Sequence, residues 1–180
     1  IIDYFKRTLD LLPSPEFWEN KFDLQFDTDE GILLIELQLP FLKDSEIYKT
    51  KELKYDEKLV FATKKESQTF TENILYLLVL RHMWSALQVD YKKYINLICC
   101  NGHVVSVDPA TGKEREDIIM SVSSSRKDLI DIQLGHVVDP SFLFQNNYSY
   151  VSSIKKSFIS DVKTNHYSNK HNKSCNFRSN

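Results

Sequence analysis

An acidic residue followed by a Glu-x-Lys triplet could form a metal-dependent nuclease site. Asp44, Glu52 and Lys54 supply the residue types, because two carboxylates can hold Mg²⁺ while the lysine assists the attacking water or stabilises charge on the phosphate. The reaction would be hydrolysis of a phosphodiester bond. Glu-x-Lys also arises by chance in a chain rich in both residues, and its spacing on a strand equally suits an exposed ion pair. We interpret it as a solvated strand edge, and a minimal nuclease stays open as an alternative.

A second acidic group could suggest a calcium site, because alternate carboxylates can converge on one hard cation. The EF-hand order is not met, since the glycine and the terminal glutamate fall at the wrong offsets. We therefore interpret the group as the solvated tip of a hairpin. Its members are Asp23, Asp27, Asp29 and Glu30.

The histidines and cysteines are weaker candidates for a metal site or a catalytic base. Cys99, Cys100 and His103 lack a paired Cys-x-x-Cys, and adjacent strand residues point to opposite faces, so we expect buried thiols rather than a zinc site. His82 lies in a predicted helix, where a packed or hydrogen-bonded histidine is commoner than a general base. A third group has ligand-like spacing but no fourth ligand: His166, His171 and Cys175.

The elements that must position these residues follow from hydrophobic periodicity. Residues 1–12 predict a short leader helix that the prolines at 13 and 15 end. Residues 22–27 and 32–39 alternate apolar and polar side chains, which predicts a hairpin of two half-buried strands. Residues 48–55 and 58–62 could extend the same sheet at its edge, where lysines discourage association.

A long helix of about 25 residues, roughly 38 Å, is predicted to follow. Two overlapping capping boxes, Thr63 to Glu66 and Thr69 to Glu72, could satisfy the first amides of this helix. Apolar residues at steps of three and four predict the stripe that packs on the sheet. They are Phe70, Ile74, Leu77, Trp84, Leu87, Tyr91 and Tyr94.

Short strands rich in Ile and Val are predicted at 95–100, 103–107, 117–123 and 129–134. Asn101-Gly102 and the segment 108–112 are interpreted as turns between them, and neither glycine pattern fits a phosphate-binding loop. Asp139-Pro140 predicts the start of a short helix. The predicted fold is α+β: an antiparallel sheet of short strands packed against one long helix, with a short leader helix and a disordered C-terminal tail.

Composition predicts one domain, residues 1–145, and an Asn-, Ser- and Lys-rich tail, residues 146–180. Asn and Ser make up 15 of these last 35 residues. The tail has six Lys or Arg and one Asp, a net +5, which leaves 17 basic and 24 acidic residues, a net −7, in residues 1–145. An acidic domain argues against extended duplex binding, although the basic tail could contact nucleic acid weakly. A solvated terminus is the favoured interpretation.

Three cysteines, two of them adjacent, are too few and too odd for a disulfide framework, so we expect reduced thiols. The richest apolar run, residues 74–80, is too short to span a membrane. No pattern typical of a secretory signal opens the chain, and its first residue hints at a fragment. A cytoplasmic protein is expected.

Four segments in order carry a family resemblance: 51–55 ("KELKY"), 71–95, 100–114 ("CNGHVVSVDPATGKE") and 125–144. Together they resemble the region that precedes the catalytic domain in a group of bacterial Mrr-like restriction endonucleases, over roughly residues 22–144. The resemblance implies that a separate C-terminal domain, with a metal-binding Asp and a Gln-x-Lys or Glu-x-Lys triplet, hydrolyses DNA with Mg²⁺. No Gln-x-Lys triplet occurs in this chain, and no catalytic residue can be carried over.

The resemblance therefore implies a non-catalytic accessory domain that positions, regulates or oligomerises a nuclease domain or partner chain. Direct contact of this region with DNA would be weak, and the domain needs no cofactor of its own. A protein-interaction module unrelated to DNA stays open as an alternative, beside the minimal nuclease that uses Asp44, Glu52 and Lys54.

Overall fold

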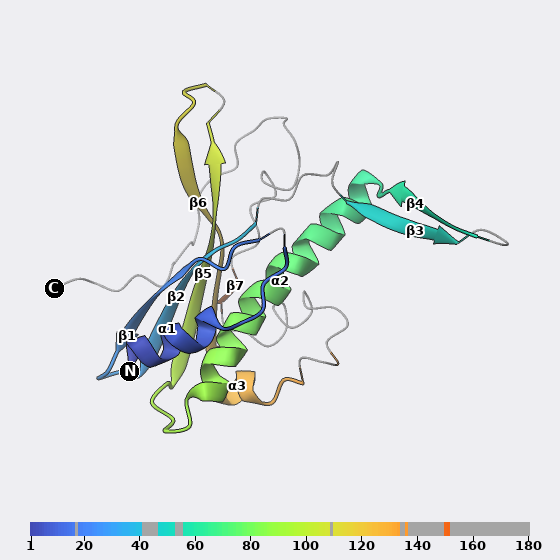
Figure 1. The fold of residues 1–180 in the computed structure, drawn as a ribbon. Helices are drawn as coiled ribbons and strands as arrows, with labels where there is room; N and C mark the ends of the chain where they lie inside the picture. The colour runs from blue at the N-terminus through green and yellow to red at the C-terminus, as the bar shows by residue number, and fades with distance from the viewer. Residues whose placement is uncertain are drawn as a thin grey trace.

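The computed structural model describes residues 1–16, 18–40, 47–52, 56–108, 110–133, 136 and 150–151. The fold is α+β, as predicted, with a long helix lying across one face of a sheet (Figure 1). The helices are α1 (Ile2–Asp10), α2 (Lys64–Val89) and α3 (Arg126–Ile130). The strands are β1 (Phe22–Asp27), β2 (Ile32–Gln38), β3 (Tyr48–Glu52), β4 (Glu57–Phe61), β5 (Leu97–Val107), β6 (Glu114–Ser125) and β7 (Tyr150–Val151).

The main sheet is mixed, whereas the sequence predicted an antiparallel one. Its order is β1-β2-β5-β6-β7, and β2 pairs with β5 in parallel while the other neighbours are antiparallel. Parallel neighbours require a long crossover connection. Here the connection contains β3, β4 and α2, and α2 returns the chain across the sheet (Figure 1).

The predicted turn at Asn101-Gly102 is wrong, because β5 continues from Leu97 to Val107. An irregularity in the pairing with β6 falls between Gly102 and His103. The second predicted turn is confirmed: Gly112 has a φ of +65°, and its amide donates to the oxygen of Asp108 over 2.7 Å. The Asp108 carboxylate also accepts from the Ala110 amide over 2.8 Å, which lowers its pKa.

The strand predicted at 129–134 is also wrong, since helix α3 occupies Arg126–Ile130. The side chain of Ser125 accepts a hydrogen bond from the amide of Asp128 over 3.2 Å, which caps the helix start. A local cap therefore overrides the strand pattern of "LIDIQL". The helix predicted at Asp139-Pro140 and the tail beyond β7 lie outside the described residues.

Helix α2 has nearly the predicted length, but the predicted stripe is confirmed only in part. Leu87 is buried and Ile74 packs against the core, whereas Phe70 and Leu77 are exposed. The helix ends at Val89, before Tyr91 and Tyr94, which are both exposed. Apolar residues surround the middle of this helix, so periodicity alone cannot select the packed face. The residues it buries are Ser67, Thr71, Leu75, Leu78, Val79, Leu80, His82, Met83, Ala86 and Leu87.

The core lies between α2 and the facing side of the sheet. Leu33, Ile35 and Leu37 of β2 are fully buried there, as the alternation predicted. The leader helix α1 is confirmed, and it adds Phe5 and Leu9 to the same cluster. Among the described helices, none is both long and apolar enough to cross a membrane.

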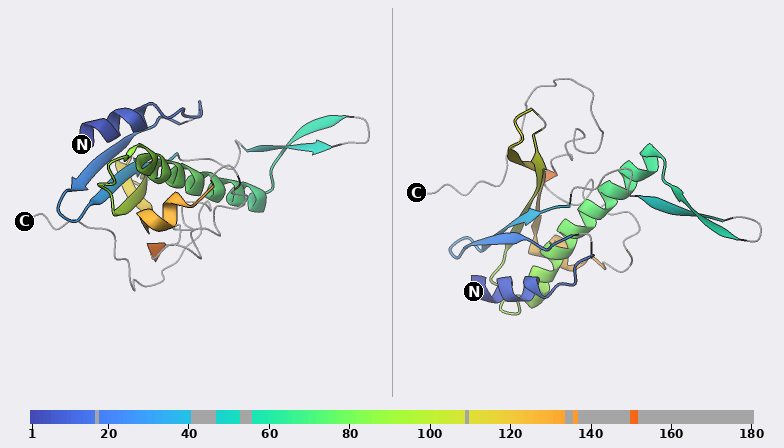
Figure 2. Two further views of the ribbon diagram at one scale, coloured as in Figure 1. Left: turned by 90° about the horizontal axis from the view of Figure 1, so that it is seen from below. Right: turned by 45° about the horizontal axis from the view of Figure 1, so that its top comes forward.

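The segments predicted to extend this sheet do not join it. β3 and β4 form a separate two-stranded antiparallel sheet. This sheet projects from the N-terminal end of α2, away from the main sheet, in every view (Figures 1 and 2).

Candidate interaction surface

The β3–β4 arm, residues 48–52 and 57–61, stands apart from the core. Strand residues that lie opposite each other on antiparallel strands point to the same face, and neighbours along a strand point to opposite faces. The arm therefore has two faces. The acidic-apolar face carries Tyr48, Thr50, Glu52, Glu57, Leu59 and Phe61, and the lysine face carries Lys49, Lys51, Lys58 and Val60.

Large apolar side chains are exposed on the acidic-apolar face. Tyr48 is 56% exposed, Leu59 69% and Phe61 61%. Tyr48 and Phe61 are directly opposite each other, with ring centroids 4.6 Å apart. They lie near α2, and the pair Glu52 and Glu57 lies at the far end of the paired segment. The face thus changes from aromatic to acidic along the arm.

Like charges lie directly opposite each other on both faces. Glu52 is paired with Glu57, and Lys51 with Lys58. Such cross-strand pairs destabilise a hairpin, and an isolated two-stranded sheet is only marginally stable in water. The sequence of the arm is therefore poorly suited to stand alone in solvent and better suited to contact a complementary surface.

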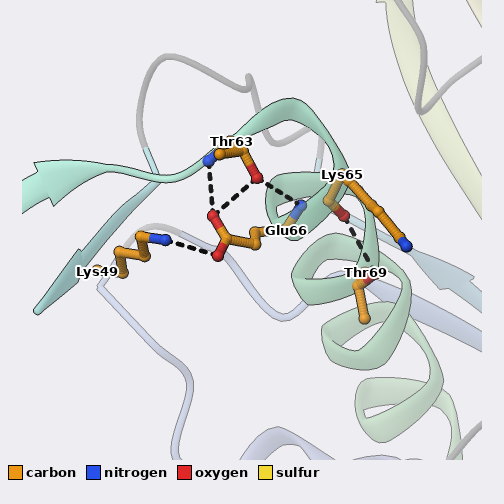
Figure 3. A network of polar contacts seen from close by, with 5 residues as sticks. All are labelled: Lys49, Thr63, Lys65, Glu66 and Thr69. Carbon is orange, nitrogen blue, oxygen red and sulfur yellow. Dashed lines mark hydrogen bonds and ion pairs between the residues drawn. The ribbon is translucent and has the colours of Figure 1, made fainter. Parts of the chain in front are cut away.

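A capping box fixes the base of the arm to α2 (Figure 3). The Glu66 carboxylate accepts from the Thr63 amide and hydroxyl, each over 2.8 Å, and Thr63 Oγ accepts from the Glu66 amide over 3.4 Å. The other oxygen of Glu66 accepts from Lys49 Nζ over 2.6 Å. The hydrogen bond from Lys49, together with those from Thr63, lowers the pKa of Glu66 to about 2. One carboxylate thus caps the helix and holds the arm.

The second predicted capping box is wrong. Thr69 lies inside α2, and its hydroxyl donates to the carbonyl oxygen of Lys65 over 3.1 Å (Figure 3). This bond to the preceding turn is the usual one for a threonine within a helix. The helix starts only at the first of the two motifs.

Of the three residues of the hypothetical nuclease site, the structure describes only Glu52. Glu52 is exposed on β3, opposite Glu57. Asp44 and Lys54 lie outside the described residues, so the convergence of the three side chains is not tested. Within the described ranges, no three His, Cys, Asp or Glu side chains are grouped as metal ligands.

Three of the four acidic residues predicted at a hairpin tip lie there: Asp27 ends β1, and Asp29 and Glu30 lie in the turn that follows. Asp27 Oδ1 accepts from the amides of Asp29 over 2.9 Å and Glu30 over 3.1 Å, which closes the turn. The Oδ1 atom of Asp27 therefore serves to close the turn. For Asp23 the prediction is wrong, because this residue lies near the start of β1, opposite Glu36 and away from the turn, with Oδ1 3.9 Å from Lys6 Nζ.

Cys99 and Cys100 are buried thiols and neither forms a disulfide, in agreement with the sequence interpretation. Cys100 lies in the core cluster, where burial strongly raises its pKa, so the reactive thiolate is disfavoured. The tail residues His166, His171 and Cys175 lie outside the described residues, as do the tail lysines.

His82 is a buried histidine, as expected from the sequence. Its Nδ1 lies 2.7 Å from the oxygen of Leu78 and its Nε2 lies 2.8 Å from Asn20 Oδ1. Trp18 and Phe22 pack against the ring, with centroids 5.7 and 6.0 Å away. Burial lowers the pKa of His82 to about 4. This side chain ties α2 to the segment before β1.

A polar row across the sheet was missed from the sequence. Asn101 Nδ2 donates to Glu36 over 2.9 Å, and Ser121 Oγ donates to Asn101 Oδ1 over 2.6 Å, so Asn101 joins β2 to β6. Near it, His103 Nε2 lies 3.1 Å from Glu116 Oε1. The available signal was the spacing of Asn101 and His103, which are two apart and so share a face of a strand, but the Asn-Gly pair was assigned to a turn.

A polar pocket of about 330 Å³ opens beside this row, lined in part by Asp23, Glu36 and His103. His103 Nδ1 makes no hydrogen bond within the described residues, yet it is buried away from water. A ligand in the pocket would therefore not reach this nitrogen. The pocket is a weaker candidate for a functional site than the exposed arm.

The arm combines projection from the core, exposed apolar side chains and an anchored base. These are the properties of an interaction surface. Comparisons with models of known protein families, with curated proteins and with solved structures find no match for this chain.

Proposed function

We propose that the chain is an accessory module that positions or regulates an Mrr-like DNA restriction endonuclease and does not itself hydrolyse DNA. The observation that carries the docking role is the β3–β4 arm, which projects from the rest of the fold (Figure 2). The side chains of Tyr48, Leu59 and Phe61 on this arm are exposed. The link to restriction endonucleases comes from the ordered resemblance of residues 22–144. The partner is a nuclease domain or a separate nuclease chain that supplies the Mg²⁺ site.

Charge supports protein contacts over extended DNA contacts. Residues 1–145 carry a net −7, and duplex binding depends on Lys and Arg neutralising phosphates. The buried thiols of Cys99 and Cys100 are compatible with a reducing compartment, and we place the module in the cytoplasm.

The proposal is tested by incubating the purified chain with plasmid DNA and Mg²⁺. No cleavage is expected. Cleavage that Lys54→Ala abolishes would establish the minimal nuclease and overturn the proposal. The DNA downstream of this reading frame is expected to encode an Asp and a Gln-x-Lys triplet, and co-expression should yield a complex of the two products.

A protein-interaction module unrelated to DNA would use the same arm, so a gel-shift titration separates the two ideas. The complex with the nuclease is expected to retard DNA, and retardation should weaken as salt rises because phosphate contacts release counterions. A complex with a protein that has no nuclease site would favour the unrelated module.

A further inference from the structure

We infer that the acidic-apolar face of the β3–β4 arm binds a segment of a partner protein that presents apolar side chains next to lysine or arginine. The inference rests on the proposed docking role and adds the chemistry of the partner. It follows from which side chains share this face and from their order along the arm.

Apolar contact is expected at the base of the arm. Leu59 and Phe61 lie on one face at alternate positions of β4, and Tyr48 lies opposite Phe61. Each of the three is more than half exposed. Single exposed apolar side chains are common on protein surfaces, but a contiguous group marks an interaction site. Aromatic residues at such positions contribute much of the binding free energy in protein interfaces.

Cation binding is expected at the far end of the same face. Glu52 and Glu57 are directly opposed and exposed. Within the described part of the chain, neither carboxylate forms an ion pair with a Lys, Arg or His. Their mutual repulsion destabilises the hairpin. A Lys or Arg from a partner would remove this repulsion and form a charge-assisted contact.

The same arrangement disfavours two other occupants. A second copy using this face would bring two Glu52–Glu57 pairs together, or place them against Tyr48 and Phe61, because the described residues of the face include no Lys or Arg. A nucleic acid would meet carboxylates where it needs cations. A basic, apolar protein segment is the occupant that matches both halves of the face.

The lysine face supplies a matched control. Lys51 and Lys58 are opposed, exposed and on the same strands as Glu52 and Glu57, but their side chains point the other way. Substitutions at Lys51 and Lys58 therefore remove charge at positions next to Glu52 and Glu57, but they alter the opposite face of the arm.

The experiment selects a random peptide display library on the full chain and measures the enriched peptides by fluorescence polarisation. Enriched peptides are expected to pair aromatic or large aliphatic residues with Lys or Arg. Glu52→Gln with Glu57→Gln should weaken binding about 2- to 30-fold, the range for two exposed ion pairs. Leu59→Ser with Phe61→Ser should abolish binding, whereas Lys51→Gln with Lys58→Gln should leave it within about two-fold.

Circular dichroism melting checks that each variant keeps the core, which these exposed side chains do not enter. The inference is overturned if no peptide is enriched, if acidic peptides are enriched, or if the lysine-face variant loses binding. It is also overturned if light scattering detects a dimer that Leu59→Ser with Phe61→Ser disrupts, or if a synthetic peptide of residues 152–180 occupies the face. DNA cleavage by the chain would contradict the proposed function and leave these binding results unchanged.

Discussion

Lys49 of β3 and Glu66 of α2 form an ion pair, with the Nζ and Oε1 atoms 2.6 Å apart, across 17 residues of sequence. The second oxygen of Glu66 accepts from the amide and hydroxyl of Thr63. Because one carboxylate makes both sets of contacts, the start of the helix and the base of the arm are held at the same point (Figure 3).

This relationship predicts the titration of Glu66. The carboxyl group should titrate near its pKa of about 2, and Lys49→Ala should raise that pKa toward the ordinary 4.5 by more than Thr63→Ala does, since Lys49 is the largest cause of the shift. The folded-state pKa is below the unfolded value, so the contribution to stability is present above pH 4.5 and is lost as pH falls through about 2. Carboxyl-detected NMR titration measures it. Lys51→Ala is the control, and an equal rise in that variant would contradict the assignment.

The two Thr-x-x-Glu motifs predict different effects of the same substitution. Thr63→Ala should lower the free energy of unfolding by about 1 kcal/mol, because it removes the side-chain cap of α2. Thr69→Ala should change it by less than about 0.5 kcal/mol, because Thr69 lies within the helix and alanine has the higher helix propensity. Urea denaturation of both variants measures the difference. Equal losses would show that the motif, rather than its position, determines the effect.

The two Thr-x-x-Glu motifs also show which parts of the fold could be predicted from the sequence. Thr63 and Thr69 both precede a glutamate by three residues, so local sequence could not decide between them. Alternation identified β1 and β2 correctly because one side of each faces the core. It also identified β3 and β4 approximately, but strand pattern carries no information on which sheet a hairpin joins. The exposure of Tyr48, Leu59 and Phe61, and hence the arm as a surface, therefore required the structure.

Asn101-Gly102 shows the opposite failure, in which a strong local signal was overridden. Asn-Gly favours a tight turn. In this fold the Asn101 amide instead bonds to Glu36, and Gly102 leaves room for Leu39. Both contacts come from β2 or the residues after it, more than 60 positions earlier in the chain. Tertiary contacts of this kind cannot be read from neighbouring residues.

Gly102→Ala should destabilise the fold by about 1–3 kcal/mol, because the new Cβ would occupy the space of the Leu39 side chain, which is itself buried. Leu39→Ala should relieve that clash, so the double variant should lose less stability than the two single variants together. Urea denaturation of the four proteins measures the coupling. Gly112→Ala is the control: its cost comes from a φ of +65° with open space around it, and Leu39→Ala should not reduce that cost. Additive effects of Gly102→Ala and Leu39→Ala would refute the packing argument.

His82 predicts a loss of stability in mild acid. Burial, the largest cause, and the nearby Arg81 lower its folded-state pKa from 6.5 to about 4, despite the opposing contact with the Leu78 oxygen. The unfolded chain therefore binds a proton between these values and the folded chain does not. The stabilising contribution is fully present above pH 6.5 and is lost as pH falls through about 4, which amounts to about 3 kcal/mol.

The unfolding free energy of wild type and His82→Gln, measured in urea across this pH range, tests the prediction. The wild type should lose about 3 kcal/mol more than the variant between pH 6.5 and pH 4, because His103, His136 and the carboxyl groups are common to both. The ring of His82 should also stay neutral by NMR until the pH approaches 4, since the contacts of Asn20, Trp18 and Phe22 keep it away from water. Parallel curves for the two proteins would mean that His82 ionises equally in the folded and unfolded states, and that its burial has no linkage to stability.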